Sequence, residues 1–213
     1  AATGKYCVFI SAHAIPGDKF WLENLINPLK EKSVAGVFGK QIPHEDCDLL
    51  DKKMAMSHWK NPRKDNEFFF SNANSAIKKS LWEKIKFDEI LPSTEDHDWA
   101  KRAALHGFRT LYEPAAAVYH SHNEGIKQRF CRTYREMLGS LMIGTKVKTS
   151  IFLLWAPFRI YTDCALIIKN RLGFRHIPKS FAVAIIESAA MNLALFTNFF
   201  RKKFNSVNNF SQN

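Results

Sequence analysis

Short apolar runs and amphipathic stretches alternate along roughly the first 120 residues of the chain. Apolar runs rich in β-branched and aromatic residues predict strands at 5–11, 34–41, 109–113 and 116–120. Apolar side chains at helical spacing predict helices at 19–30, 49–59, 75–85 and 95–105. This alternation predicts an α/β fold, in which a sheet carries helices on both faces.

Three of these segments carry a more specific expectation. The run 5–11 has no polar break, which is typical of a buried parallel strand. The helix at 75–85 is expected to begin at Ser75, because serine is a good N-cap residue. The segment 43–66 is mostly polar, so the helix within it is expected to lie in a surface excursion.

The pattern changes after residue 125. Two long apolar runs, 150–168 and 181–200, are each interrupted by charged or amide side chains. Because a charge in the middle of a bilayer is costly, the runs favour helices that lie at a membrane surface over clean membrane spans. The alternative is that they pack as ordinary core helices. Arg129, Arg132 and Arg135 fall on one helical stripe, which is expected to face solvent or lipid, with one arginine able to reach donor phosphates.

Charge and cysteine content add two constraints. The 213-residue chain has net charge +11, and residues 123–213 hold 14 Lys and Arg against four Asp and Glu. A basic, apolar tail indicates an anionic membrane surface as partner, and no nucleic acid is expected. The four cysteines are scattered without a paired motif, which favours a reducing, cytosolic setting. The chain opens directly into a predicted strand without a Met, so we expect it to be a piece of a longer protein.

An acidic cluster provides the first candidate chemistry. Glu95, Asp96, His97 and Asp98 follow Ser93-Thr94 and fall on the first turn of a predicted helix. Backbone N–H groups and the positive end of the helix dipole keep carboxylates ionised there. An ionised carboxylate that faces a cleft can act as a general base. The plain alternative is that the cluster only caps and solvates the helix.

Other polar residues follow the predicted strands. In an α/β sheet, ligands bind at the carboxyl ends of the strands, so these residues could meet Asp96 in one cleft. They are His13, Asn72, Asn74 and either His120 or His122. Each also has a simpler interpretation, since histidines can end strands and asparagines favour turns and caps.

Four segments, in this order, resemble the family 2 glycosyltransferases, which have the GT-A fold. They are 2–13, leading into Ser11-Ala12-His13; 70–82, with Asn72-Ala73-Asn74; 87–99, with Phe87-Asp88-Glu89 and Glu95-Asp96; and 112–122, ending in His120-Ser121-His122. The resemblance implies a GT-A-like, partial Rossmann-type sheet with flanking helices over 1–124. An all-α, membrane-associating tail over 125–213 would follow it.

The resemblance implies an inverting transfer of a hexose or deoxyhexose at the cytoplasmic face of a membrane. The chain would be attached peripherally or weakly integrally. The donor would be a nucleotide-sugar and the acceptor a glycan or a lipid-linked sugar. The residue matching the family's catalytic base is Asp96, and Glu95 would orient the acceptor or the loop. The substrate contacts implied are Asn72, Asn74, Asp98 and Trp99, the last by stacking on a sugar ring unless it serves packing.

The same family binds a divalent metal, Mn²⁺ or Mg²⁺, through a carboxylate motif. That position here reads Ser11-Ala12-His13, without a carboxylate. Some relatives use a histidine there, so His13 with His120 and His122 would be the ligands. Imidazole suits Mn²⁺ or a similar transition ion better than Mg²⁺. A metal-independent variant, in which His, Arg or Lys side chains stabilise the diphosphate, is the alternative.

The resemblance covers only the later part of the family's catalytic domain. The family's opening βαβ half, which carries the nucleotide site, has no counterpart in these residues. The chain alone is therefore expected to bind a donor poorly. A non-catalytic, membrane-associated remnant or partner module of a glycosyltransferase is the alternative to an enzyme.

Overall fold

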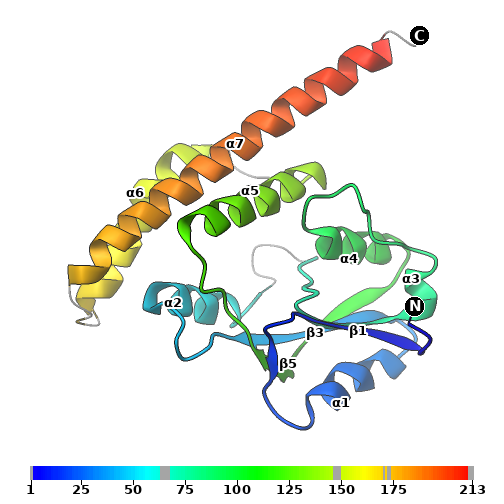
Figure 1. The fold of residues 1–213 in the computed structure, drawn as a ribbon. Coiled ribbons are helices and arrows are strands. Elements are labelled where there is room, and N and C mark those ends of the chain that lie inside the picture. Colours follow the sequence, from blue (N-terminus) through cyan, green and yellow to red (C-terminus); the bar gives the residue numbers. More distant parts are fainter. Residues whose placement is uncertain (1, 63–67, 146–149, 170, 172–173, 211–213) are drawn as a thin grey trace. The chain divides into compact units, whose positions relative to one another are not determined.

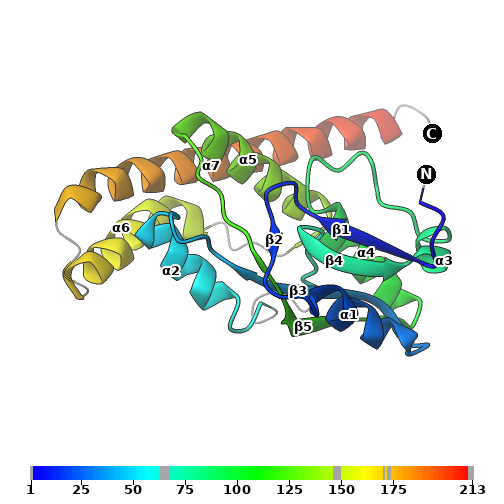
Figure 2. The same ribbon diagram turned by 60° about the horizontal axis from the view of Figure 1, so that its bottom comes forward.

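The computed structural model describes residues 2–62, 68–145, 150–169, 171 and 174–210. Two compact units make up the chain. The first comprises Ala1–Glu89 and Glu95–Asn123, and the second comprises Ile90–Thr94 and Glu124–Asn213. Figures 1 and 2 show the fold of each unit.

A five-stranded sheet forms the centre of the first unit in the described part of the chain, with the order β1-β4-β3-β5-β2. The strands are β1 Tyr6–Ile10, β2 Ile15–Pro16, β3 Val34–Ile42, β4 Asn74–Lys78 and β5 Arg109–Tyr119. Strands β3 and β5 are parallel, and every other neighbouring pair is antiparallel. Because β3 and β5 run the same way, the segments that follow them begin at the same edge of the sheet.

Helices cover both faces of this sheet (Figure 1). On one face lie α1 Trp21–Ile26 and the 3₁₀ helix η1 Asn27–Lys30. On the other lie α2 Leu49–His58, α3 Lys79–Trp82 and α4 Glu95–Leu105. Neighbouring residues of β4 show the division, since Ala76 packs with Leu25 and Leu29 while Ile77 packs with Trp99. The expected α/β sheet with flanking helices is confirmed.

The prediction of a buried parallel strand at 5–11 is wrong. Strand β1 lies at the sheet edge and pairs antiparallel with β4. Val8 and Ile10 are 39% and 41% exposed. An uninterrupted apolar run indicates that apolar side chains lie on both faces of the strand. It does not indicate which of these faces the rest of the protein covers.

The prediction of a helix beginning at Ser75 is also wrong. Residues 74–78 form β4, which lies between β1 and β3, and α3 is confined to Lys79–Trp82. Ile77, Leu81 and Ile85 pack in the same core, which explains their helix-like spacing. Pairing with strands on both sides overrode this local pattern, since every backbone group of a buried segment needs a hydrogen-bond partner.

Two further expectations need adjustment. Helix α1 ends at Ile26 and continues as a 3₁₀ turn, because Pro28 lacks the N–H that an α-helix would use. The expected surface helix is found at Leu49–His58, but the next residue, Trp59, is buried in the core. Residues 63–66 of that excursion lie outside the described residues.

A bulge in β5 replaces the two separate strands expected at 109–113 and 116–120. Gly39 of β3 pairs with Glu113, but Gln41 pairs with Val118, so residues 114–117 lie opposite Lys40 alone. The Asn74 amide donates to the carbonyl oxygens of Lys40 (3.3 Å) and Ala116 (2.7 Å) and so ties the bulge to the sheet. A Cβ at Gly39 would collide with the Ala116 carbonyl, which explains a glycine here.

Three long helices form the second unit: α5 Ile126–Met142, α6 Ser150–Lys169 and α7 Ile177–Phe210. The 3₁₀ helix η2 Phe174–His176 precedes α7. Helix α7 packs against both α5 and α6 through small buried residues, including Ala184, Ala190 and Ala194. The segment 90–94 belongs to this unit, since the Ser93 carbonyl leaves no room for a Cβ at Gly139 of α5.

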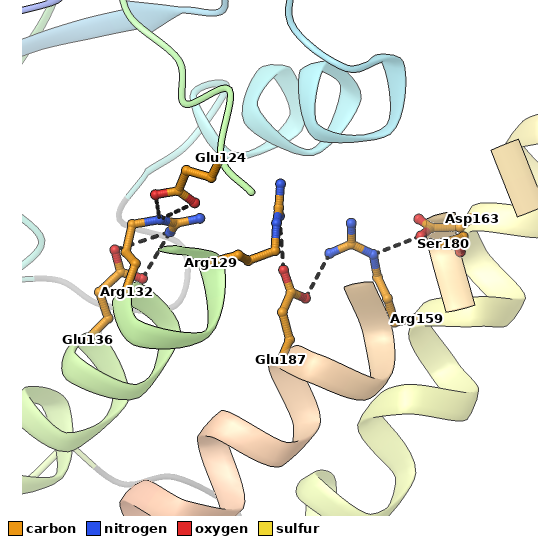
Figure 3. A network of polar contacts seen from close by, with 8 residues as sticks. All are labelled: Glu124, Arg129, Arg132, Glu136, Arg159, Asp163, Ser180 and Glu187. Atoms are coloured by element: carbon orange, nitrogen blue, oxygen red, sulfur yellow. Dashed lines mark hydrogen bonds and ion pairs between the residues drawn. The ribbon is translucent and has the colours of Figure 1, made fainter. Parts of the chain in front are cut away.

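A buried ionic network joins the three helices (Figure 3). Glu187 of α7 accepts from Arg129 of α5 at 3.1 Å and from Arg159 of α6 at 3.2 Å. Arg159 also pairs with Asp163 at 3.0 Å, and the Ser180 hydroxyl donates to Asp163 at 2.8 Å. The charges that interrupt the apolar runs therefore neutralise one another inside the helical unit.

This network corrects the expected arginine stripe. Arg129 is buried and paired rather than facing solvent or lipid. Arg132 pairs with Glu124 at 2.8 Å and with Glu136 at 3.2 Å. Arg135 is exposed, and its guanidinium donates to the Cys131 carbonyl. A helical period places residues on one stripe but does not reveal which acidic partners another helix brings to it.

Replacing Glu187 with glutamine should lower the free energy of unfolding of the second unit by about 3–5 kcal/mol, because two buried arginines would lose the carboxylate that they share. Denaturant-dependent hydrogen exchange of the α7 amides measures this. The matched control is Glu136→Gln on α5, whose side chain is 50% exposed and which should cost less than about 1 kcal/mol. Equal losses in the two variants would contradict the assigned role of the network.

Candidate functional site

Three histidines gather in the first unit. His13 follows β1, and His120 and His122 follow β5. Their ring centroids lie 4.6 Å (13–120), 5.0 Å (13–122) and 4.8 Å (120–122) apart. One potential ligand nitrogen on each lies within 4.8 Å of those on the other two. We refer to these three residues as the histidine cluster.

Backbone pairing brings the cluster together. The short strand β2 pairs with β5 through Ile15 and Tyr119, so the loop that carries His13 lies beside the end of β5. The His120 N–H donates to the Ile42 carbonyl at 2.7 Å, which fixes that residue at the end of β3. His13 and His122 are exposed, so their rings have room to adjust around a ligand.

His120 differs from the other two because it is buried, with 8% of its surface exposed. Its Nδ1 lies 2.7 Å from Gln41 Oε1, and its Nε2 has no hydrogen-bond partner among the described residues. Burial, followed by the nearby His122, His13 and His44, lowers the pKa of His120 to about 4. The ring is therefore neutral at pH 7. A neutral, buried imidazole with an unused nitrogen beside two other imidazoles fits a metal ligand.

His44 and Gln41 are functional candidates that sequence reasoning missed. His44 lies just beyond β3; its Nε2 is 3.2 Å from the His13 carbonyl, and its backbone N–H donates to the Ser121 hydroxyl. Their place at or just after the end of a predicted strand could have marked them as site candidates, because the ends of parallel β3 and β5 must share one edge. The parallel pairing itself, however, was not readable from the sequence.

Asp96 lies at the first turn of α4, as expected, and its carboxylate is held by two backbone N–H groups. Asn72 N–H donates to Oδ2 and His97 N–H donates to Oδ1, both at 2.9 Å. The side chain is half-buried, as is that of the preceding Glu95. Asn72 is thus placed beside Asp96 through its backbone. Donors at a helix N-terminus favour a negative charge on this carboxylate.

The remaining candidate substrate contacts have structural partners. Asp98 accepts from Arg102 Nε at 2.7 Å, one helical turn away. Asn74 is completely buried and accepts from Trp21 Nε1 at 2.8 Å, in addition to holding the bulge. Trp99 is also completely buried, and its Nε1 donates to the Ile85 carbonyl. Because complete burial leaves no surface for a sugar, Asn74 and Trp99 are omitted from the proposed site.

Comparison with known proteins identifies the class of relatives. No protein-family model matches the chain. The chain is 30% identical over 146 residues to the O-antigen chain rhamnosyltransferase WbaN of Salmonella anatum, a match that covers 63% of this chain and 46% of that protein. It is 27% identical over 139 residues to the O-antigen chain rhamnosyltransferase RfbN of Salmonella typhimurium, covering 60% of this chain and 44% of that protein. The chain is related to glycosyltransferases.

The match spans less than half the length of either curated relative. Among solved structures, the chain is similar to the mannosyltransferase PcManGT from Pyrobaculum calidifontis in complex with GDP-Man and Mn²⁺, with a TM-score of 0.57. That likeness covers 92% of this chain and 64% of the other at 15% identity. It shows the fold: a glycosyltransferase-like sheet with flanking helices, followed by a helical C-terminal part.

Acidification should destabilise the metal-free first unit through His120. The pKa of His120 is lowered in the folded state, so its contribution to stability is complete above about pH 6.5 and is lost as the pH falls toward 4. The loss should reach about 3 kcal/mol, since each pKa unit corresponds to about 1.4 kcal/mol. Hydrogen exchange of the β3 amides in the presence of a chelator, at pH 7 and at pH 4.5, measures it.

The control for this prediction is the variant pair His120→Asn and His106→Asn. His106 is exposed near the end of α4. The pH-dependent loss should shrink in His120→Asn and persist in His106→Asn. A loss of the same size in both variants would show that another group controls the acid response.

Proposed function

We propose that the chain is part of an inverting glycosyltransferase that moves a hexose or deoxyhexose from a nucleotide-sugar to a glycan or lipid-linked acceptor. The observation that carries the proposal is the histidine cluster, in which His120 Nε2 has no partner among the described residues. The cluster lies in the same unit as the oriented carboxylate of Asp96. The two rhamnosyltransferase relatives support a deoxyhexose as the transferred sugar.

The ligands proposed for a divalent metal are His13, His120 and His122. Three imidazole ligands favour Mn²⁺ or a similar transition ion over Mg²⁺, which prefers oxygen ligands. The similar mannosyltransferase structure contains Mn²⁺ together with GDP-Man. When bound, such an ion supplies positive charge opposite the diphosphate leaving group. The protein's own part is to hold the three rings at one sheet edge.

Asp96 is proposed as the general base. Its carboxylate would accept the proton of the acceptor hydroxyl as that oxygen attacks the anomeric carbon, giving inversion in a single displacement. The N–H groups of Asn72 and His97 hold both carboxylate oxygens, so the base is already oriented before an acceptor binds. Glu95 is proposed to orient the acceptor from the same helical turn.

A non-catalytic partner module is the second candidate. Ser11-Ala12-His13 lacks the carboxylates of the metal motif that the family resemblance leads us to expect, and the matched region is less than half of each relative. A module would retain the fold and the histidine cluster without turnover. The activity experiment below separates the two candidates.

Asp96→Asn should lower sugar transfer by at least about 100-fold, because general base catalysis contributes about 10²–10⁴-fold. The assay follows radiolabelled sugar from GDP-mannose, or from a nucleoside diphosphate rhamnose, into a lipid extract of the host membranes. It uses the whole protein that carries this chain, with Mn²⁺ or with a chelator. Removing the metal should also abolish transfer.

The matched control is Glu83→Gln, which removes an exposed carboxylate that pairs with Lys79 at 3.6 Å and should leave transfer unchanged. Melting temperatures of the variants establish that each is folded. Wild-type protein that is folded and transfers no sugar from either donor would favour the partner module instead. Full activity in Asp96→Asn would remove Asp96 from the mechanism.

The second unit is proposed to lie on the cytoplasmic face of an anionic membrane. Helix α7 contains the stretch Ile177–Lys203, which is long and apolar enough to cross a membrane by length and composition alone. Large apolar side chains are exposed along α6, η2 and α7: Phe158, Tyr161, Ile168, Phe174, Phe181, Ile185, Leu193, Phe196, Phe199 and Phe200.

A peripheral position is favoured over a span because Glu187, within that stretch, pairs with arginines of α5 and α6. Inserting α7 alone into a bilayer would break both ion pairs and leave the charge of Glu187 in hydrocarbon. The excess of basic residues in 123–213 adds attraction to acidic lipids.

The double variant Phe196→Ser, Phe199→Ser should bind anionic vesicles at least tenfold more weakly than wild type. The two side chains are 63% and 62% exposed, and burying each in lipid is worth about 2 kcal/mol. Sedimentation with vesicles of phosphatidylcholine and phosphatidylglycerol, at low and high salt, measures binding. The control is Leu105→Ser, which removes an exposed apolar side chain (78%) from α4. Equal binding of the wild type and the double variant would contradict a lipid-facing α7.

A further inference from the structure

Gln41 lies between the histidine cluster and the segment that holds Asp96. It is buried near the end of β3, with 8% of its surface exposed. Its Oε1 is 2.7 Å from His120 Nδ1, and its Nε2 donates to the Ser71 hydroxyl at 2.9 Å. Both ends of the amide are therefore engaged by polar side chains, those of His120 and Ser71.

The contact with Gln41 determines which nitrogen of His120 carries the proton. An amide oxygen can only accept a hydrogen bond, so His120 Nδ1 must donate to it. In a neutral imidazole the other nitrogen then has no proton and carries a free lone pair. That nitrogen, Nε2, is the atom with no partner among the described residues. The hydrogen bond thus prepares one specific atom as a metal ligand.

The other end of the amide leads to the proposed base. Ser71 directly precedes Asn72, whose N–H donates to Asp96 Oδ2 at 2.9 Å. A continuous path of short contacts therefore runs from the His120 ring, through the Gln41 amide and the Ser71 hydroxyl, to the backbone that orients Asp96. Its members come from the residue after β5, from β3 and from the segment before β4, and all lie in the first unit.

We propose that Gln41 is a positioning residue, which holds His120 in the Nδ1–H tautomer so that Nε2 is offered to a metal ion. The same amide fixes the Ser71–Asn72 segment on which Asp96 depends. This inference rests on the metal site of the proposed function. Gln41 touches neither substrate nor metal in this proposal and acts through His120.

The first measurement is the tautomer of His120 in the metal-free, full-length chain. Long-range ¹H–¹⁵N correlation at pH 7.5 distinguishes protonated from unprotonated ring nitrogens, and comparison with His120→Asn identifies the signals. In wild type we expect a protonated Nδ1 and an unprotonated Nε2. Gln41→Leu, which removes the acceptor, should give a mixture of tautomers, whereas Gln41→Glu keeps an acceptor and should restore the Nδ1–H form.

The second measurement is metal affinity, by calorimetry with Mn²⁺ and Co²⁺. Gln41→Leu should bind about 10–100-fold more weakly than wild type, as expected for loss of the partner that orients a histidine ligand. Gln41→Glu should bind at least as tightly as wild type. The control is Asn27→Leu, which removes an amide from the exposed end of α1 and should change neither readout.

The outcomes separate this inference from the function on which it rests. A wild-type His120 with its proton on Nε2, or undiminished metal affinity in Gln41→Leu, would overturn the role of Gln41 even if wild type binds Mn²⁺. A wild type that has the Nδ1–H tautomer but binds neither ion would overturn the proposed metal site, and with it the ligand part of the inference. The expected tautomer together with weakened binding in Gln41→Leu and recovery in Gln41→Glu would support it.

Discussion

The parallel pairing of β3 with β5 brings the groups that surround His120 to one edge of the sheet. Parallel strands end at the same edge, so Gln41 and His44 come to lie beside His120 and Ser121. The bulge at 114–117 re-aims the end of β5, and Asn74 fixes it from β4. The glycine at 39 is required because the Ala116 carbonyl approaches too closely for a side chain. Without this pairing, Gln41 and His44 would not meet the histidine cluster.

The described residues include both buried charges that are paired and buried polar atoms that have no partner. In the helical unit, the buried carboxylate of Glu187 is shared between the buried side chains of Arg129 and Arg159, so the charges of this network are paired with one another. In the sheet unit, one nitrogen of buried His120 is left without a partner among the described residues. Native proteins rarely leave such a group unsatisfied without a use for it. Unlike the other such atoms, on Trp82, Asn198 and Arg201, His120 Nε2 lies among further potential metal ligands, so the histidine cluster is the place where a ligand is expected.

Local chemistry was readable where the chain's own neighbours decide the structure. The α4 helix was predicted from its apolar spacing and its acidic first turn, and it ends just before Gly107, which takes a positive φ of 80°. The ordered segments that resemble glycosyltransferases also pointed to relatives that the comparisons support. Strand β4 was misjudged because its apolar spacing fits a helix when read alone. Its pairing partners, 6–10 and 36–38, are remote in sequence.

The sequence by itself determined the alternation of strands and helices, the residue types at the strand ends and the basic, apolar character of the last ninety or so residues, because these depend on local composition and period. The tertiary structure alone decided which of those residues meet. It brought the three histidines together, added Gln41 and His44 to them, and buried Asn74 and Trp99 completely. It also turned an apparent solvent-facing arginine into a buried ion-pair partner of α7. Contacts of this kind depend on pairing and burial between distant segments, which no local pattern records.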